Sequence, residues 1–372
     1  MNDLQISIPA DLLPEDGRFG SGPSKVRTEA IGALYRSAPG YMGTSHRQKG
    51  VRSVVGRLRE GLADLFSLPD GYEVMLGNGG ATVLWDALVF SVIRERIQHV
   101  VFGEFSSKFA QASALALHLE EPEIISSEPG SHPDPKPSEL VDAYALTHNE
   151  TSTGVSMPVK RVESNGLVLV DATSAAGALR VEPSEFDVYY FSPQKGFASD
   201  GGLWIALCSP AAIERVAQIC DSDRYIPSSL DLLVALENSR QNQTYNTPAL
   251  ATLFLTVEQI DWMLDNGGLE WAAGRCDASA DILYGWAETN RLTTPFVKDP
   301  GQRSHVVGTI DFSEAVDAQR VAAVLRANGI VDTEPYRKLG RNQLRVGMYP
   351  AVEPEDVRQL TRCIDFVVDA LG

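Results

Sequence analysis

Short apolar runs alternate with longer amphipathic segments between residues 51 and 207. Many of the runs are apolar throughout, which is typical of strands buried on both faces of a parallel sheet. The segments between them repeat apolar residues at helical spacing, so the pattern predicts a central, largely parallel sheet with helices on both faces. The expected strands are residues 73–76, 100–102, 123–125, 143–147, 168–171, 188–191 and 203–207, and the expected helices include 51–66, 82–96 and 106–119.

The alternation ends at a long helix that is expected to start near Pro248. Thr247 can cap that helix, Pro248 suits its first turn, and the pair Gly267 and Gly268 can end it. Beyond it, residues 269–372 contain two expected helices and two or three expected strands, one of them at 344–348.

The fold class is therefore expected to be α/β with two domains. A chain of 372 residues exceeds the size of one ordinary hydrophobic core. We expect a large domain over residues 18–265, with a mainly parallel seven-stranded sheet between helices, and a smaller C-terminal α+β domain over 266–372. The Pro-, Ser- and Gly-rich stretch 126–138 is expected to be an exposed loop, because strand alternation resumes after it.

Composition narrows the class of protein. Hydrophobic residues make up 44% and charged residues 22% of the chain, which describes a globular protein and not a disordered one. The balance of 32 basic and 49 acidic residues gives a net charge of −17, which opposes binding to nucleic acid or an anionic membrane through bulk charge. An anionic substrate must therefore be bound by a local basic cluster.

The sequence indicates neither a targeting segment nor a metal site. Residues 1–19 carry four acidic residues and no basic or long apolar stretch, so they are not expected to form a signal peptide. Apolar runs such as 87–93 are too short to span a bilayer. The four cysteines are widely spaced, with no paired spacing and no companion histidine cluster. We expect a cytoplasmic protein with reduced thiols and no metal site.

Lys195 is the most informative candidate for chemistry. It follows the expected strand 188–191 and is flanked by Pro193 and Gly196, with no adjacent acid, which suits a buried amine that attacks a carbonyl. Asp171 ends the preceding expected strand. Pyridoxal phosphate needs this pair, since the lysine carries its aldehyde and the acid holds the proton of its ring nitrogen. Taken singly, the acid could be a turn residue and the lysine a solvated surface charge.

A cofactor phosphate needs a helix amino terminus, and the turn 77–82 supplies one. A strand runs there through Gly79 and Gly80 into a helix, so backbone amides and the helix dipole can bind an anion. The alternative is a plain strand-to-helix turn. The turn has neither the Walker spacing nor the GxGxxG spacing of a dinucleotide site. Phe105, after the next expected strand, could cover a ring or could be a core residue.

Together these residues resemble the phosphoserine aminotransferases, which are class V, fold-type I pyridoxal-phosphate enzymes. The resemblance runs in order from about Phe19 to the carboxyl terminus. Each motif is weak alone, but the ordered set is fairly specific. The motifs are Gly20 to Pro23, Ser45-His46-Arg47, Asn149-Glu150-Thr151 with Gly154, Asp171, Gln194-Lys195 and Asn246-Thr247-Pro248.

The resemblance implies a set of cofactor contacts and a homodimer with shared active sites. It makes Lys195 the Schiff-base lysine and Asp171 the partner of the ring nitrogen. The other implied contacts are Thr151 and Gln194 with the ring substituents, Phe105 with the ring face, Ala81 and Thr82 with the phosphate, and Asn246 and Thr247 with the phosphate from the second subunit.

The implied reaction passes an amino group from L-glutamate to 3-phosphohydroxypyruvate in serine biosynthesis, and the resemblance leaves open a second role in vitamin B6 biosynthesis. Both substrates carry an α-carboxylate and a second anion, for which the planar fork of arginine is well suited. Arg345 interrupts an apolar strand, where an unpaired charge would be costly. The resemblance implies that it binds the α-carboxylate. The resemblance assigns His46 and Arg47 to substrate binding across the dimer.

Two departures concern recognition of the substrate phosphate. Many relatives have an arginine where this chain has Thr82, and a His-Arg pair where it has Tyr336 and Arg337. Arg337, with Lys338 and Arg341 nearby, could compensate, although such basic loops are usually only solvated.

Other functions were weighed on the same residues. The nearest alternative is another class V transamination, such as alanine or serine with glyoxylate or pyruvate. A cysteine desulfurase is disfavoured because no cysteine lies in a Gly- and Ser-rich loop of the expected kind. A cofactor-binding regulator would need a basic helix-turn-helix segment, and a nicotinamide dehydrogenase would need a different glycine spacing.

Overall fold

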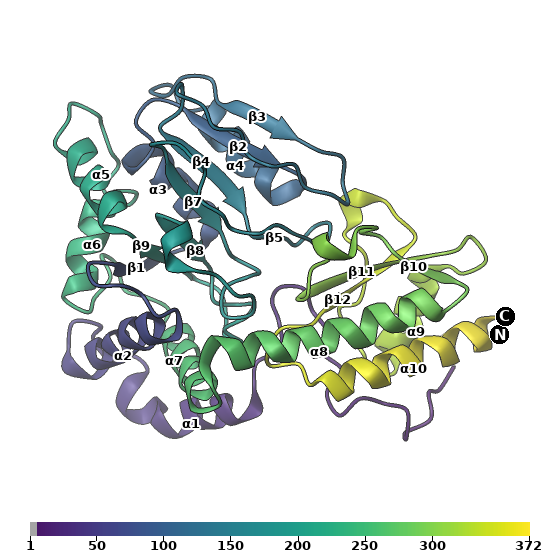
Figure 1. The fold of residues 1–372 in the computed structure, drawn as a ribbon. Coiled ribbons are helices and arrows are strands. Elements are labelled where there is room, and N and C mark those ends of the chain that lie inside the picture. The colour runs from purple at the N-terminus through teal and green to yellow at the C-terminus, as the bar shows by residue number, and fades with distance from the viewer. Residues whose placement is uncertain (1–5) are drawn as a thin grey trace.

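The computed structural model describes residues 6–372 and contains a seven-stranded sheet and a three-stranded sheet, each with its own helices (Figure 1). The order of the large sheet is β1-β9-β8-β7-β4-β2-β3, and all its strands are parallel except β9, which runs antiparallel to both neighbours. The expected α/β class and the mainly parallel seven-stranded sheet are therefore confirmed. The strands are β1 (Glu73–Asn78), β2 (Ile97–Val101), β3 (Glu123–Ser126), β4 (Ala143–Thr147), β7 (Leu167–Asp171), β8 (Val188–Phe191) and β9 (Leu203–Cys208).

Helices cover both faces of this sheet, as the apolar runs predict. Within β7, Val168 and Val170 pack in one cluster with α2 and α7, whereas Leu167 and Leu169 pack in the other with α3, α5 and α6. A strand buried on both faces has no polar side to show, which is why the run is apolar throughout. The helices of this part are α1 (Thr28–Tyr41), α2 (Lys49–Leu65), α3 (Ala81–Ser91), α4 (Glu104–Ala114), α5 (Pro210–Cys220), α6 (Leu232–Arg240) and α7 (Leu250–Asp265).

Strand β2 starts three residues before its expected position, and α3 ends five residues early. The start of β2 was not predicted because Gln98 and His99 are polar, yet both are buried in the strand. Gln98 Nε2 donates to Glu123 Oε2 at 2.9 Å, and His99 Nε2 lies 2.7 Å from Ser113 Oγ. Buried polar groups are tolerated when they are hydrogen-bonded, so polarity did not exclude these positions from the sheet.

The expected cap of α7 is wrong. The helix begins at Leu250 with Ala249 as its N-cap residue. Thr247 lies outside the helix, where its carbonyl accepts a 2.7 Å hydrogen bond from Asn78 Nδ2. The end of the helix agrees with the prediction, since Gly267 follows it with a φ of +119°.

The C-terminal part is a three-stranded antiparallel sheet in the order β10-β11-β12, packed with helices. It contains three α-helices where two were expected. Ile8 and Phe19, from the other end of the chain, are buried in the same core. The domain division at residues 265 and 266 stays a prediction. The elements are α8 (Gly268–Thr289), β10 (Thr293–Pro295), β11 (Val307–Phe312), α9 (Ala318–Ala327), β12 (Gln343–Gly347) and α10 (Pro354–Leu371).

Short elements complete the structure. After β3, residues 127–138 form the expected irregular loop. A two-stranded hairpin of β5 (Asn149–Glu150) and β6 (Val155–Ser156) follows β4, and 3₁₀ turns occur at Pro183–Glu185, Pro300–Gln302 and Arg337–Leu339. None of the described helices could span a membrane, and residues 6–372 contain no group of three or more His, Cys, Asp or Glu arranged to hold a metal. All four cysteines are free thiols.

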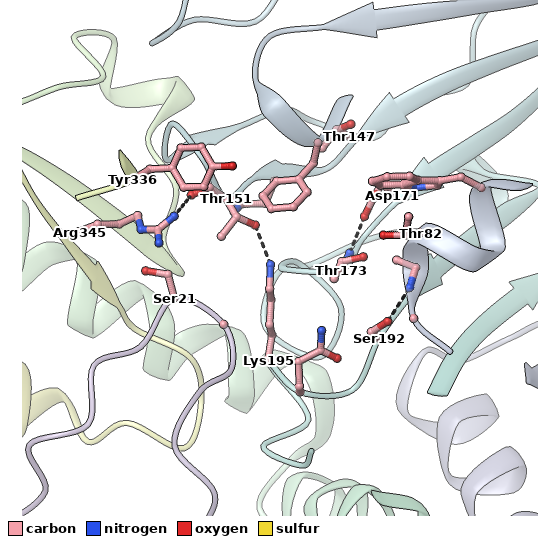
Figure 2. A pocket seen from close by; sticks show the side chains of 17 residues that line it. Ser21, Thr82, Thr147, Thr151, Asp171, Thr173, Ser192, Lys195, Tyr336 and Arg345 are labelled. Atoms are coloured by element: carbon pink, nitrogen blue, oxygen red, sulfur yellow. Dashed lines mark hydrogen bonds between the residues drawn. The ribbon is translucent and has the colours of Figure 1, made fainter. Parts of the chain in front are cut away.

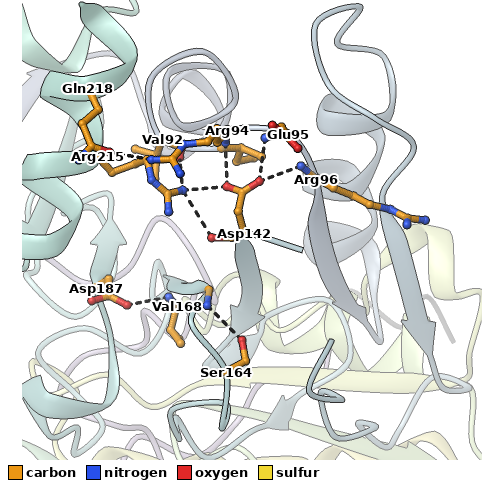
Figure 3. A network of polar contacts seen from close by, with 12 residues as sticks. Val92, Arg94, Glu95, Arg96, Asp142, Ser164, Val168, Asp187, Arg215 and Gln218 are labelled. Atoms are coloured by element: carbon orange, nitrogen blue, oxygen red, sulfur yellow. Dashed lines mark hydrogen bonds and ion pairs between the residues drawn. The ribbon is translucent and has the colours of Figure 1, made fainter. Parts of the chain in front are cut away.

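Two aspartates fix the edge of the large sheet where the parallel strands begin (Figure 3). The carboxylate of Asp142, just before β4, accepts hydrogen bonds from the three consecutive amides of residues 94–96 and from Arg215 Nη1. Asp187, just before β8, accepts from the amide of Val168 at 2.8 Å. These carboxylates hold the amino ends of the strands in place, and the opposite edge carries the pocket described next.

Candidate active site

A pocket of about 310 Å³ lies at the carboxyl ends of β1, β4, β7 and β8 (Figure 2). Ligands of open α/β sheets bind at this edge because the loops that leave the strands converge there. Residues from both parts of the chain surround it. The lining residues are Ser21, Gly22, Gly80, Ala81, Thr82, Trp85, Phe105, Thr147, Asn149, Thr151, Asp171, Thr173, Ser192, Gln194, Lys195, Tyr336 and Arg345.

Lys195 projects into this pocket from the loop after β8 and is only 7% exposed. Its Nζ donates a 2.8 Å hydrogen bond to Thr151 Oγ1. A Cβ on Gly22 would come within 2.4 Å of Lys195 Cε, so only glycine allows the chain to pass this closely. Burial lowers the pKa of the amine from 10.5 to about 8, because the charged form loses its hydration. The amine is therefore neutral, and nucleophilic, at a lower pH than an exposed lysine.

Asp171 ends β7 and is 6% exposed, on the opposite side of the pocket from Arg345 (Figure 2). Its carboxylate accepts hydrogen bonds from Trp85 Nε1 at 3.2 Å and from the amide of Thr173 at 2.9 Å. Burial raises its pKa, because the charged form loses its hydration, and the hydrogen bonds from Thr173 and the charge of Lys195 offset this only in part. In the described part of the chain the carboxylate forms no ion pair within 4 Å. A buried acid of this kind favours a ligand with a protonated nitrogen.

Between Lys195 and Asp171, the wall of the pocket is a hydrogen-bonded chain of small polar groups. Thr151 Oγ1 donates to Ser174 Oγ at 2.9 Å, and Ser174 Oγ donates to the carbonyl of Asn149 at 2.9 Å. Other buried polar atoms at the pocket have no partner within the described residues, namely Ser21 Oγ, Asn149 Oδ1, Thr173 Oγ1 and Gln194 Oε1. Unpaired buried polar atoms are rare in folded proteins, so several at one pocket indicate a polar ligand.

The amino terminus of α3 forms one end of the pocket, as predicted from the Gly-rich turn. Gly79 has a φ of +107°, which other residues rarely adopt, and lets the chain turn sharply from β1 into the helix. Gly80 is the N-cap residue and has no side chain to cap the helix. The amide of Ala81 donates a 2.8 Å hydrogen bond to Ser192 Oγ, and the exposed Thr82 follows it. This helix end offers an anion site with a dipole and a hydroxyl group.

Phe105 lies one residue inside α4, with its ring centroid 5.4 Å from Lys195 Nζ. A fully buried carboxylate, Glu150, holds its backbone in place. Glu150 accepts hydrogen bonds from the amides of Phe105 and Ser106 at 3.2 and 3.0 Å, and from the hydroxyl of Ser152 at 2.7 Å. A carboxylate suits the positive end of the helix dipole. Glu150 thereby ties the helix that carries Phe105 to the loop that carries Thr151.

Arg345 enters the pocket from β12, so the C-terminal part supplies a cation to it. One guanidinium nitrogen, Nη1, donates to the carbonyl of Thr151 at 3.2 Å, whereas the buried Nε has no partner in residues 6–372. Burial lowers the pKa of this arginine. The unused donors of the guanidinium can bind a carboxylate in the bidentate manner that arginine favours.

Five of the expected site residues do not line this pocket in the single chain, namely His46, Arg47, Asn246, Thr247 and Arg337. His46 Nδ1 lies 3.3 Å from Thr247 Oγ1, and Arg47 Nη1 donates to Gln243 Oε1 at 2.6 Å. The structure thus brings the loop before α2 and the loop before α7 together, but away from the pocket lining. Arg337 is exposed on a 3₁₀ turn beside Tyr336, and the fifth residue, Asn246, is exposed next to Thr247.

Sequence reasoning missed several residues that line the pocket, among them Trp85, Ser192 and Tyr336. Trp85 lies one helical turn after Ala81, so a search one turn into the expected helix could have found it. Ser192 ends the run before Pro193, where a small hydroxyl residue gives little signal. Tyr336 was noted only as a departure from relatives, and its place against Arg345 depends on how the two parts of the chain pack.

A sequence model of the family Aminotransferase class-V matches residues 135–360, well over half of the chain. The chain is similar over nearly its whole length to curated proteins named phosphoserine aminotransferase. It is 61% identical over 370 residues to that of a Nocardioides species, covering 98% of this chain and 99% of the relative. It is 59% identical to that of Rhodococcus jostii, covering 98% of both chains.

Solved structures share this fold. The crystal structure of a phosphoserine aminotransferase from Cytophaga hutchinsonii matches with a TM-score of 0.86 at 24% identity, covering 96% of this chain and 100% of that one. That of Bacillus circulans matches with a TM-score of 0.83 at 20% identity, covering 96% and 99%. A pyridoxal-phosphate-bound phosphoserine aminotransferase from Trichomonas vaginalis matches with a TM-score of 0.82 at 18% identity, covering 94% and 100%.

Proposed function

The chain belongs to the class V aminotransferases and, within them, to the phosphoserine aminotransferases, and from this membership we propose its reaction. The protein transfers an amino group between L-glutamate and 3-phosphohydroxypyruvate, giving O-phospho-L-serine and 2-oxoglutarate, with pyridoxal 5′-phosphate as cofactor. The observation that carries the proposal is the meeting of Lys195, Asp171 and Arg345 in one pocket of a chain about 60% identical to its named relatives.

The residues of the pocket fit this cofactor. Its buried acid without an ion pair suits a ring nitrogen that carries a proton, and its unpaired polar atoms suit the ring substituents. The amino terminus of α3 suits the phosphate, and Phe105 suits the ring face. When bound, pyridoxal phosphate supplies an aldehyde carbon and a ring that withdraws electrons from the substrate. We assign Asp171 to the ring nitrogen, Thr151 and Gln194 to the ring substituents, and Ala81 and Thr82 to the phosphate.

Lys195 is the group that we propose moves the proton. Its amine is desolvated and has a lowered pKa, so it can act as a nucleophile and then as a base near neutral pH. With the cofactor bound, its Nζ would be the base that takes the proton from the substrate α-carbon and later gives it back. Thr151 orients Nζ through the 2.8 Å hydrogen bond between them.

Arg345 is the proposed partner of the α-carboxylate in both substrates. Lys338 and Arg341 are poor candidates for the second anion, because they already pair with Glu104 and Asp311. Arg337 has no acidic partner within 4 Å among residues 6–372 and is exposed beside the pocket, so we assign it to the substrate's second anion.

We propose a homodimer in which His46, Arg47, Asn246 and Thr247 complete the pocket of the partner subunit. These residues lie together outside the pocket of their own chain. Exposed apolar side chains support a second copy at this face, since Ile31 and Tyr35 lie one turn apart on α1, Met42 is exposed directly after the helix, and Tyr35 is 80% exposed. We further propose that the protein works in the cytoplasm and also makes 4-phosphohydroxythreonine for vitamin B6, since that product carries the same two kinds of anion.

The visible absorption spectrum of the purified protein tests this proposal. We expect a yellow band that is lost on adding O-phospho-L-serine but persists with L-serine. Bleaching by serine alone would point to another class V aminotransferase. A protein that stays colourless after incubation with pyridoxal phosphate would refute the proposed function altogether.

A further inference from the structure

Arg345 is a half-buried cation that lacks a carboxylate partner. Other arginines of the C-terminal part pair with acids, as Arg341 does with Asp311 and Arg303 with Glu288. Arg345, in contrast, makes one hydrogen bond to a backbone carbonyl, and no acid among residues 6–372 lies within 4 Å of it. Something other than a counter-ion must hold its guanidinium in place.

The ring of Tyr336 lies beside the guanidinium of Arg345, in place of a counter-ion. The guanidinium carbon of Arg345 lies 5.2 Å from the ring centroid, within the range of a cation–π contact, and the two side chains lie together in Figure 2. The same ring lies 6.5 Å from the ring of Phe105, between centroids. Tyr336 therefore connects the cation proposed to bind substrate with the ring proposed to cover the cofactor.

Tyr336 is itself tied to the opposite wall of the pocket. Two residues later, Lys338 pairs with Glu104, the first residue of α4. Tyr336 also lines a second pocket of about 300 Å³, with Ser107, Ser127 and Ser152 among its other walls. Tyr336 thus borders both pockets.

We propose that Tyr336 is a positioning residue for Arg345. Its ring face stabilises the guanidinium without using any of the N–H donors, so the substrate carboxylate is left as the only acid that pairs with them. An acidic side chain in place of the ring would fix the arginine equally well, but it would compete with the substrate. The inference rests on the proposed function, because it assigns Arg345 to the α-carboxylate.

A role in positioning Arg345 accounts for the tyrosine at position 336, where many relatives have histidine. Relatives with histidine there present an imidazole, which is also aromatic but is smaller and can carry charge near neutral pH. In this chain the ring supports Arg345 while Arg337, the next residue, stays exposed. One turn therefore serves both anions: Tyr336 supports Arg345, which is assigned to the α-carboxylate, and Arg337 is itself assigned to the second anion.

Three variants and one control test the proposal in the full-length holoenzyme. Tyr336→Phe keeps the ring, whereas Tyr336→Leu and Tyr336→Met remove it. Tyr225→Leu changes an exposed tyrosine in the loop between α5 and α6. For each protein, we would measure kcat and KM for L-glutamate and O-phospho-L-serine, the cofactor spectrum, and the affinity for glutarate, a dicarboxylate that has no amino group to transfer.

Loss of the ring should weaken binding of both substrates and leave the chemical step in place. We expect KM for both substrates to rise roughly two- to thirty-fold in Tyr336→Leu and Tyr336→Met, which is the range of a cation–π contact. kcat and the cofactor spectrum should stay close to those of the wild type, and Tyr336→Phe and Tyr225→Leu should behave as the wild type.

Several results would overturn the inference. Unchanged KM in both ringless variants would do so, as would a fall in kcat with loss of cofactor colour, since that indicates general disruption of the pocket. A large effect in Tyr336→Phe would assign the role to the hydroxyl instead. If the wild type itself failed to react with glutamate and phosphoserine, the proposed function would fail first, so the two failures are distinguishable.

Discussion

At the scale of single residues, the chemistry of this pocket depends on burial. Lys195 and Asp171 carry opposite charges, yet in both cases loss of hydration is the largest influence on the pKa. Burial lowers the pKa of the lysine and raises that of the aspartate, so both neutral forms are favoured relative to exposed side chains. Asp171 and Glu150 act against the shift of the lysine, and Arg345 adds to it.

The lowered pKa of Lys195 predicts how the cofactor-free protein takes up pyridoxal phosphate. Only the neutral amine attacks the aldehyde, so the rate of covalent attachment should rise with pH and level off above about 8. The check is stopped-flow absorbance across pH 6 to 10 with a fixed cofactor concentration.

Lys195→Ala should still bind the cofactor without covalent attachment, and its turnover should fall at least roughly 10²- to 10⁴-fold. A rate that keeps rising to pH 10, or near-normal turnover in Lys195→Ala, would contradict this account.

The same residues show how far sequence reasoning extends at this scale. Lys195 and Asp171 could be selected from residue type and place at the end of a strand, Arg345 from a charge within an apolar strand together with the family resemblance, and Thr151 from the resemblance alone. The structure places all four at one pocket. Trp85 was not selected. Its place one turn after Ala81 could have marked it as a candidate, but a tryptophan in an apolar helix is equally well a core residue, and its hydrogen bond to Asp171 is visible only in the structure.

At the scale of elements, α4 depends on a side chain from another part of the chain. Its N-cap residue is a glycine, and Glu150 supplies the carboxylate that its first amides require. A Cβ on Gly103 would come within 2.3 Å of Glu150 Cγ, so the glycine makes room for that carboxylate. The position of Phe105 thus depends on Glu150.

Glu150→Gln is predicted to loosen this helix start. The variant loses the charge, and its NH₂ group can face amides that are donors themselves, so the free energy of unfolding should fall by about 2–3 kcal/mol. Urea unfolding at fixed protein concentration measures this change, and a titration with pyridoxal phosphate should show weaker binding because Phe105 is less well held. The control is Glu163→Gln, at an exposed position. Wild-type stability and cofactor affinity in Glu150→Gln would refute the proposed capping role.

Element type was more predictable than element boundaries. All seven strands of the large sheet were predicted, most of them because strands buried on both faces need apolar runs, whereas the edge strand β3 is partly exposed. The start of β2 and the end of α3 could not, since Gln98 and His99 find their partners only in the folded chain. The cap of α7 failed for a similar reason, because the Thr247 hydroxyl lies 3.3 Å from His46 Nδ1, across the structure, instead of at the start of the helix.

At the scale of the whole molecule, the face formed by α1 and the loops around Arg47 and Thr247 is the one that we propose binds a second copy of the chain. Tyr245 is also exposed there, and its carbonyl accepts from Arg47 Nη2 at 3.3 Å. If this face binds a second copy, each pocket contains Lys195 of one subunit and Arg47 of the other.

Mixing two inactive variants tests the shared pocket. Lys195→Ala and Arg47→Ala should each lose most activity alone. A mixed dimer of the two has one pocket with both substitutions and one with neither, so random exchange should restore about one quarter of wild-type activity. Co-expression with two different affinity tags isolates the mixed dimer, and gel filtration checks that Arg47→Ala still assembles. No recovery from an intact mixed dimer would mean that Arg47 acts within its own subunit.

The sequence alone determined the class of fold, the order of the large sheet's strands along the chain and the residue types able to carry pyridoxal-phosphate chemistry, because periodicity and local motifs encode these. Only the tertiary structure decided that β9 runs antiparallel, that Ile8 and Phe19 are buried with the C-terminal helices, and that Tyr336 lies against Arg345. Such features depend on contacts between residues far apart in the chain, which no local pattern specifies. The pocket combines both, since its residues were predictable one by one and its electrostatics follow from their shared burial.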